Sequence, residues 1–144
     1  MKTDQKIKLF LVDDDALYLK SMEIDFLEIG EYTVETFATG ELCLQNIALN
    51  PDIIILDYHL NAIDKTAING LETLDKIKVI NPNIPVVILS SQDRIEVAVN
   101  CMHHKAFDYV VKNETAFMRI QKIIDLILKL HKIQTELKWY MDRV

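Results

Sequence analysis

Four short apolar runs, each ending at a polar side chain, constrain this chain more than any other feature. They span residues 7–12, 53–56, 86–89 and 107–111 and are rich in β-branched or aromatic residues. Runs of this kind are typical of strands buried on both faces, as in a parallel sheet. The Val and Thr content of 32–37 predicts a fifth, weaker strand.

Amphipathic helical patterns separate these strands. Apolar residues recur at helical spacing in four segments: Leu19, Met22, Phe26 and Ile29; Leu44, Ile47 and Ala48; Leu71, Leu74 and Ile77; and Val97, Ala98, Cys101 and Met102. The alternation of strands with helices predicts an α/β fold with right-handed crossovers. We therefore expect a doubly wound, five-stranded parallel sheet.

The chain after Thr115 contains neither Gly nor Pro, which predicts one long final helix. One face is expected to close the sheet, through Phe117, Ile120, Ile124 and Ile127. A second apolar set repeats at 3-4-3-4-3 spacing, and we call it the heptad seam: Ile123, Leu126, Leu130, Ile133, Leu137 and Tyr140.

This pattern divides the chain into a domain over 1–128 and an extension of the last helix over 129–144. The extension either folds back on its own domain or acts as a dimer or linker helix. Trp139 supplies a large apolar surface, which favours contact with another molecule.

Composition excludes several classes of function. The 144 residues fit one domain, and the formal net charge of −6 argues against direct binding of nucleic acid, which needs a basic face. No apolar run approaches the roughly 20 residues of a membrane span, and the N-terminus lacks a signal-peptide pattern. We expect a cytoplasmic location, no membrane insertion, and reduced thiols at Cys43 and Cys101.

The polar residues that end the strands are the candidates for chemistry. Because the carboxyl ends of parallel strands share one edge of a sheet, and open α/β folds bind ligands there, these side chains are expected to lie together. They provide three carboxylates, one hydroxyl and one ammonium group, from Asp13, Asp14, Asp57, Ser90 and Lys112.

Clustered carboxylates repel one another, and a divalent cation would relieve that repulsion. Oxygen ligands favour Mg²⁺, with Mn²⁺ as a second choice. A carboxylate can also act as a nucleophile and form an aspartyl phosphate. The pattern predicts metal-dependent phosphoryl chemistry, in which Lys112 and Ser90 contact the phosphoryl group.

The sequence resembles the receiver domain of bacterial two-component response regulators in four motifs. They are LVDDD at 11–15, IILDYHL at 54–60, VVILSSQ at 86–92 and DYVVK at 108–112. The resemblance covers about residues 6–128 and implies a (βα)5, flavodoxin-like receiver fold. It implies that Asp57 accepts a phosphoryl group from a sensor histidine kinase or a phosphotransfer protein.

The resemblance also implies the metal ligands. Asp14 and Asp57 would bind Mg²⁺ directly, and Asp13 would bind it through water. His59 would contribute its backbone carbonyl. The receiver would catalyse its own phosphorylation and dephosphorylation without being a turnover enzyme.

The switching residues follow from the same resemblance. Ser90 and Lys112 would contact the phosphoryl group, and Tyr109 would turn inward when Ser90 moves toward it. His59 and Gln92 flank the reaction and would influence the lifetime of the phosphorylated form. A downstream protein would bind the face made by the fourth helix, fifth strand and fifth helix. The heptad seam, independently of the resemblance, favours a homodimer through the last helix.

The sequence departs from the family pattern in three ways. Asn61 stands where proline is usual and Gly70 comes about five residues late, so the loop over 58–69 is expected to be extended. Asn113 replaces the proline that normally follows the strand-end lysine, and we expect a trans peptide there. Lys105 replaces a common glycine.

Two other functions compete with this interpretation. A turnover enzyme of the haloacid-dehalogenase type also forms an aspartyl phosphate, and Asp13-Asp14-Asp15 superficially fits its motif, but Asp57 would then be unexplained. A receiver-like dimerisation scaffold would signal without phosphate. A stand-alone receiver and a receiver cut from an output domain both fit the sequence.

Overall fold

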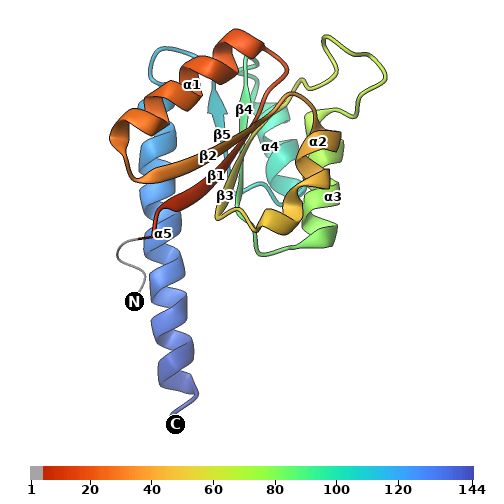
Figure 1. Cartoon of the computed structure of the whole chain (residues 1–144). Helices are drawn as coiled ribbons and strands as arrows, with labels where there is room; N and C mark the ends of the chain where they lie inside the picture. The colour runs from red at the N-terminus through yellow and green to blue at the C-terminus, as the bar shows by residue number, and fades with distance from the viewer. Residues whose placement is uncertain (1–4) are drawn as a thin grey trace.

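The five predicted strands form one parallel sheet in the order β2-β1-β3-β4-β5. The computed structural model describes residues 5–144. Its elements are β1 (Ile7–Val12), α1 (Ala16–Ile29), β2 (Tyr32–Phe37), α2 (Gly40–Gln45), the 3₁₀ turn η1 (Ile47–Leu49), β3 (Ile53–Asp57), α3 (Gly70–Ile80), β4 (Val86–Ser90), α4 (Ile95–His103), β5 (Asp108–Val111) and α5 (Ala116–Met141). This confirms the predicted fold (Figure 1).

The sheet separates two apolar cores, because alternate residues of a strand point to opposite faces. Leu9 and Leu11 of β1 pack in the core that contains α1 and α5, whereas Phe10 and Val12 pack in the core with α2, α3 and α4. The neighbouring strands β3 and β4 divide in the same way. Burial on both faces explains why these strands appear in the sequence as continuous apolar runs.

Local signals set where the helices α1 and α3 begin. Asp15 caps α1 by accepting from the N–H groups of Leu17 and Tyr18, at 3.1 and 3.2 Å. Asn69 and Glu72 begin α3 with a reciprocal capping box, in which each side chain accepts from the other residue's N–H. The first of these caps places the helix directly after the acidic turn that follows β1.

Three helical details differ from the predicted patterns. Ile47 lies in the separate turn η1, because α2 ends at Gln45. Met102 and Ile29 are 43% and 36% exposed, so both lie at the margin of their helix's buried face. Lys105 has a φ of 77°, the left-handed conformation that glycine favours, which explains why this departure from glycine is unusual.

The two halves of α5 have different environments. Ile120, Ile124 and Ile127 are buried and close the sheet, as predicted. From residue 129 onward every side chain is exposed, including Trp139, and Figure 1 shows this half projecting past the sheet. The fold-back interpretation is therefore wrong. The boundary proposed at 128 falls inside one continuous helix and stays a prediction.

No helix within residues 5–144 combines the length and the apolar character that crossing a membrane requires.

Candidate functional site

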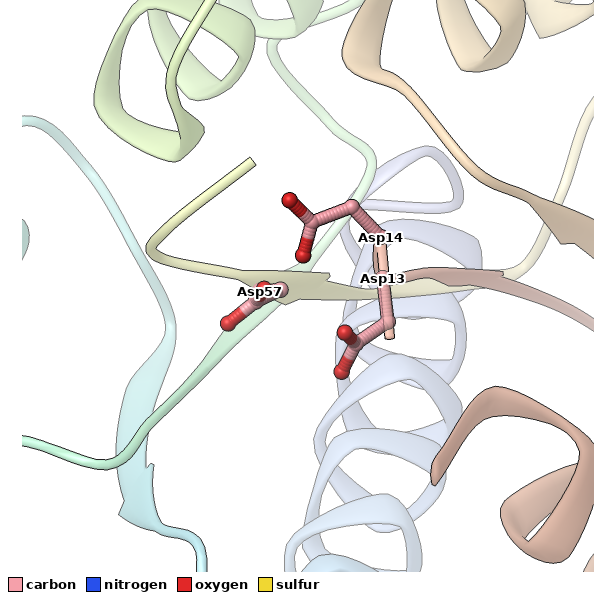
Figure 2. Close-up of side chains that lie close together, drawn as sticks. All are labelled: Asp13, Asp14 and Asp57. Carbon is pink, nitrogen blue, oxygen red and sulfur yellow. The ribbon is translucent and has the colours of Figure 1, made fainter. Parts of the chain in front are cut away.

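Three carboxylates meet at the carboxyl edge of the sheet, where the strand order reverses. Asp13 and Asp14 directly follow β1, and Asp57 ends β3. Because β2 and β3 lie on opposite sides of β1, this edge is the switch point at which doubly wound folds bind ligands. One oxygen from each carboxylate lies within 4.8 Å of the others, and Figure 2 shows the three side chains gathered at the strand ends.

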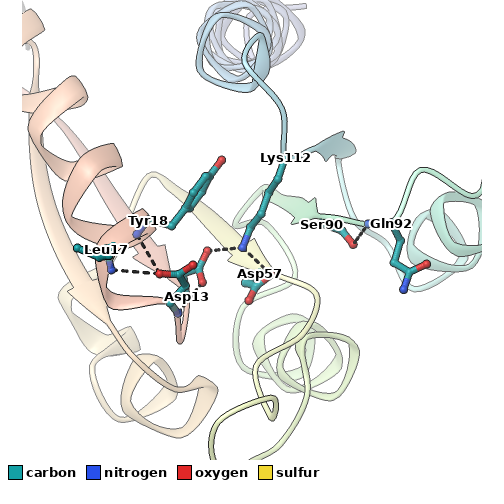
Figure 3. A network of polar contacts seen from close by, with 8 residues as sticks. Asp13, Leu17, Tyr18, Asp57, Ser90, Gln92 and Lys112 are labelled. Atoms are coloured by element: carbon teal, nitrogen blue, oxygen red, sulfur yellow. Dashed lines mark hydrogen bonds and ion pairs between the residues drawn. The ribbon is translucent and has the colours of Figure 1, made fainter.

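Lys112 places a positive charge against this acidic cluster. It follows β5, and its ammonium nitrogen lies 2.8 Å from Oδ2 of Asp13 and 3.3 Å from Oδ1 of Asp57 (Figure 3). The same nitrogen lies 4.5 Å from the ring centroid of Tyr18, a cation–π arrangement. Sequence reasoning missed Tyr18, since nothing in its local pattern separates it from a surface residue of α1.

Burial controls the protonation of Asp57. Burial first, and then repulsion from Asp13, raises the pKa of Asp57 to about 7, although Lys112 and the backbone of His59 act in the opposite direction. Burial alone would lower the pKa of Lys112, but the two carboxylates outweigh it and raise that pKa above its ordinary value. Lys112 therefore stays charged, while Asp57 exchanges a proton near neutral pH.

The donor set fits a hard divalent cation. When ionised, three carboxylates against one ammonium leave two negative charges, which one such cation balances. Oδ2 of Asp13 is buried and, within the part of the chain that the structure describes, has no partner besides the ion pair with Lys112. Oxygen ligands that leave room for water suit Mg²⁺. His59 is half-buried beside Tyr58, and the role of its carbonyl stays a prediction.

Ser90 and Tyr109 are connected through the backbone of Gln92. Ser90 ends β4 and is fully buried, whereas Ser91 is exposed, so Ser90 is the hydroxyl that faces the interior. Its Oγ accepts from the N–H of Gln92 at 3.0 Å, and the carbonyl of Gln92 accepts from the Tyr109 hydroxyl at 2.6 Å. Figure 3 shows Ser90 and Gln92 on the side of Asp57 away from Tyr18.

The peptide bond that joins Lys112 to Asn113 is trans, as predicted, and no peptide bond within residues 5–144 is cis. The N–H of Lys112 donates to the carbonyl of Ser90 at 2.7 Å. This bond continues the pairing of β4 with β5 and holds the base of the lysine side chain at the site.

The sequence pattern of the response regulator receiver domain matches residues 9–125. The chain belongs to this family. The match agrees with a site made from the ends of β1, β3, β4 and β5, and it excludes the dehalogenase-type interpretation.

The relatives of this receiver domain are mostly longer proteins. A protein-glutamate methylesterase/protein-glutamine glutaminase of Clostridium acetobutylicum is 31% identical over 130 residues, which cover 87% of this chain and 36% of the relative. The crystal structure of NtrX from Brucella abortus has a TM-score of 0.81 at 26% identity and covers 97% of this chain and 31% of its own. The BeF3-activated DrrB receiver domain has a TM-score of 0.70 at 26% identity, covering 84% of this chain and 99% of its own. This receiver therefore spans about a third of the curated relative's length.

The receiver's β3–α3 loop is extended, as predicted, and Gly70 closes it. The N–H of Gly70 donates to the carbonyl of Tyr58 at 3.0 Å, which brings the two ends of the loop together. A Cβ atom at Gly70 would lie 2.3 Å from the backbone oxygen of Asp57 and 2.7 Å from Cα of Tyr58. The late glycine therefore permits a close backbone contact directly behind the candidate phosphorylation site.

We expect Gly70→Ala to lower the free energy of unfolding by about 1–3 kcal/mol, because the new methyl group must displace backbone. The displaced backbone includes that of Asp57, so the rate of phosphorylation should fall as well. Gly30→Ala is the matched control: Gly30 has a φ of 83°, but nothing lies within 4 Å of its Cβ position. It should cost roughly 1 kcal/mol and leave phosphorylation unchanged. Urea denaturation measures the free energy of unfolding of each variant, and a phosphorylation assay measures its rate. Equal changes in the phosphorylation rate of the two variants would contradict this expectation.

Proposed function

We propose that this receiver domain accepts a phosphoryl group on Asp57 from the phosphohistidine of a sensor kinase or phosphotransfer protein, in a Mg²⁺-dependent reaction. The observation that carries the proposal is the convergence of Asp57 with two carboxylates and with Lys112, 3.3 Å away. An acceptor, a set of metal ligands and a cation are what phosphoryl transfer needs, because its catalysis is mainly positioning and charge neutralisation.

In the proposed reaction a carboxylate oxygen of Asp57 attacks phosphorus in line with the donor nitrogen. The P–O bond forms as the P–N bond breaks, and the imidazole leaves with the electron pair and takes up a proton. Lys112 stabilises the negative charge on the transferred group. Mg²⁺ held by Asp13, Asp14 and Asp57 would neutralise charge on the phosphoryl oxygens. Attack by water on phosphorus later restores the carboxylate and releases inorganic phosphate.

The proposed switch runs from Ser90 to Tyr109. When the Ser90 hydroxyl turns toward a phosphoryl oxygen, it loses the hydrogen bond that it accepts from the N–H of Gln92. The carbonyl of the same residue accepts a hydrogen bond from the Tyr109 hydroxyl, so movement of Gln92 reaches Tyr109. A change at the phosphate is thereby passed to β5 and to the neighbouring α4. Ile95 and Val99 on α4 are 78% and 48% exposed, which supports a protein-binding surface there.

The exposed heptad seam supports a second proposal, that α5 associates with another copy of this chain. Leu130, Ile133 and Leu137 are 39%, 53% and 57% exposed, on a helix half that projects past the sheet. The alignment with NtrX extends over 97% of this chain, so this half has a counterpart in a longer protein. A scaffold that dimerises without phosphate is the alternative function, and the intact acidic site argues against it.

The test incubates the chain with acetyl phosphate, with Mg²⁺ or with excess chelator, and measures the phosphorylated fraction by intact mass spectrometry. We expect phosphorylation only with Mg²⁺, since the buried carboxylates need a cation before a phosphoryl group can approach. Sedimentation with and without beryllofluoride, in the presence of Mg²⁺, measures association in the same samples. A chain that dimerises but never takes up phosphate or beryllofluoride would support the scaffold instead.

A further inference from the structure

The extended loop over 58–69 is held by specific contacts and projects at the carboxyl edge of the sheet (Figure 1). Leu60 is 1% exposed and anchors the start of the loop in the core. In the outer part, Asp64 accepts from the N–H of Thr66 at 2.9 Å and from its hydroxyl at 2.6 Å. These contacts give the outer part of the loop a defined local shape.

Two carboxylates from outside the loop accept hydrogen bonds from its backbone. Oδ2 of Asp14 accepts from the N–H of Ile63 at 3.2 Å, and Oε2 of Glu41, in the first turn of α2, accepts from the N–H of Ile68 at 3.0 Å. Asp14 belongs to the acidic cluster and Glu41 does not. The side chain of Ile63 is 74% exposed, so its backbone makes the contact and its side chain contributes little.

We propose that this loop is a positioning element for the metal site, in which the N–H of Ile63 orients the Asp14 carboxylate and Glu41 holds the loop in place. The proposal rests on the Mg²⁺ site proposed above. A carboxylate has two oxygens, so Oδ2 of Asp14 can accept from Ile63 while its other oxygen would be available to a cation. Metal-binding carboxylates depend on such outer hydrogen bonds for their orientation, and losing one typically weakens metal binding by about 10-fold or more.

Metal binding and loop order are coupled by this arrangement. If the ordered loop favours Mg²⁺ binding, bound Mg²⁺ must favour the ordered loop by the same free energy. Lys65 is exposed in the outer part of the loop, so trypsin can cleave after it whenever the loop opens. The rate of this cleavage reports on the loop without any measurement of phosphorylation.

The test compares Ile63→Pro, Ile63→Ala and Glu41→Ala with the unaltered chain. Proline removes the N–H that reaches Asp14, whereas alanine keeps it and removes only the exposed side chain. Calorimetric titration with Mg²⁺ should show about 10-fold weaker binding for Ile63→Pro, a smaller loss for Glu41→Ala and no loss for Ile63→Ala. Mg²⁺ should slow trypsin cleavage at Lys65 in the unaltered chain and in Ile63→Ala, but much less in Ile63→Pro.

Equal Mg²⁺ affinity in Ile63→Pro and Ile63→Ala would overturn the positioning role and leave the proposed function intact. Cleavage at Lys65 that does not respond to Mg²⁺ would do the same. An unaltered chain that binds no Mg²⁺ would overturn both proposals. If circular dichroism shows that Ile63→Pro is unfolded, Glu41→Ala decides the question, because unchanged Mg²⁺ affinity in that variant overturns the coupling.

Discussion

Asp57→Asn is expected to abolish phosphorylation by acetyl phosphate and by any phosphohistidine donor. The amide has almost the same shape as the carboxylate, but it carries no negative oxygen to attack phosphorus. It also removes one of the three carboxylates that converge on the proposed metal site. Intact mass spectrometry should detect no phosphorylated protein, and beryllofluoride should no longer bind in the presence of Mg²⁺.

The same variant should keep or gain stability, which separates loss of chemistry from loss of fold. Burial and Asp13 raise the pKa of Asp57 from 3.8 to about 7. A carboxyl whose pKa is raised by folding stabilises the protein at low pH, and this stability is lost as pH rises through that value. Asparagine avoids this loss, so at pH 8 without Mg²⁺ the variant should be more stable than the unaltered chain by roughly 1–3 kcal/mol. A destabilised variant at that pH would contradict the assigned electrostatics.

Lys112→Met, unlike Asp57→Asn, should destabilise the protein, and it should also slow phosphorylation strongly. Among residues 5–144, the ion pairs place only Lys112 on the carboxylates of Asp13 and Asp57. Removing one partner of a buried ion pair typically costs about 3–5 kcal/mol, because the remaining charge stays buried without compensation. Loss of a donor that stabilises transition-state charge should slow phosphorylation by about 100- to 1,000-fold.

Mg²⁺ separates these two effects of Lys112→Met. A cation bound by the carboxylates should restore much of the lost stability, but it does not replace the ammonium beside the phosphoryl group. Thermal unfolding and phosphorylation rates, each measured across a Mg²⁺ titration, test this difference. Lys122→Met, at an exposed position of α5, is the control and should change neither quantity. Full recovery of the rate at high Mg²⁺ would show that Lys112 acts only on stability.

Most of the fold and the centre of the site could be predicted from the sequence, because both depend on local patterns. Continuous apolar runs result from burial on both faces of a parallel sheet, and the residue that ends such a strand must lie at the carboxyl edge. Asp57 and Ser90 were predicted at this edge for that reason. The capping box of Asn69 and Glu72 is likewise a local signal, and it begins the helix that carries the predicted apolar face of Leu71, Leu74 and Ile77.

The contacts that surround this centre could not be predicted, because they join residues far apart in the chain. The bond from Ile63 to Asp14 spans 49 residues, and the bond from Ile68 to Glu41 spans 27. The donors in both bonds are backbone N–H groups, which every residue except proline has. The residue types at 63 and 68 therefore do not reveal these contacts. Tyr18 lies against Lys112 for a similar reason, because the packing of α1 on the sheet decides which residue of its first turns meets the lysine.

The projecting half of α5 has one practical consequence. Trp139 is the only tryptophan in the chain, and it lies in that half, 57% exposed and stacked with Arg143 at 4.0 Å from the ring centroid. Since no tryptophan lies in the acidic cluster, intrinsic indole fluorescence should be insensitive to Mg²⁺ and phosphate there. The same signal should shift to shorter wavelengths when another helix covers the end of α5, which gives association an optical reporter without any added label.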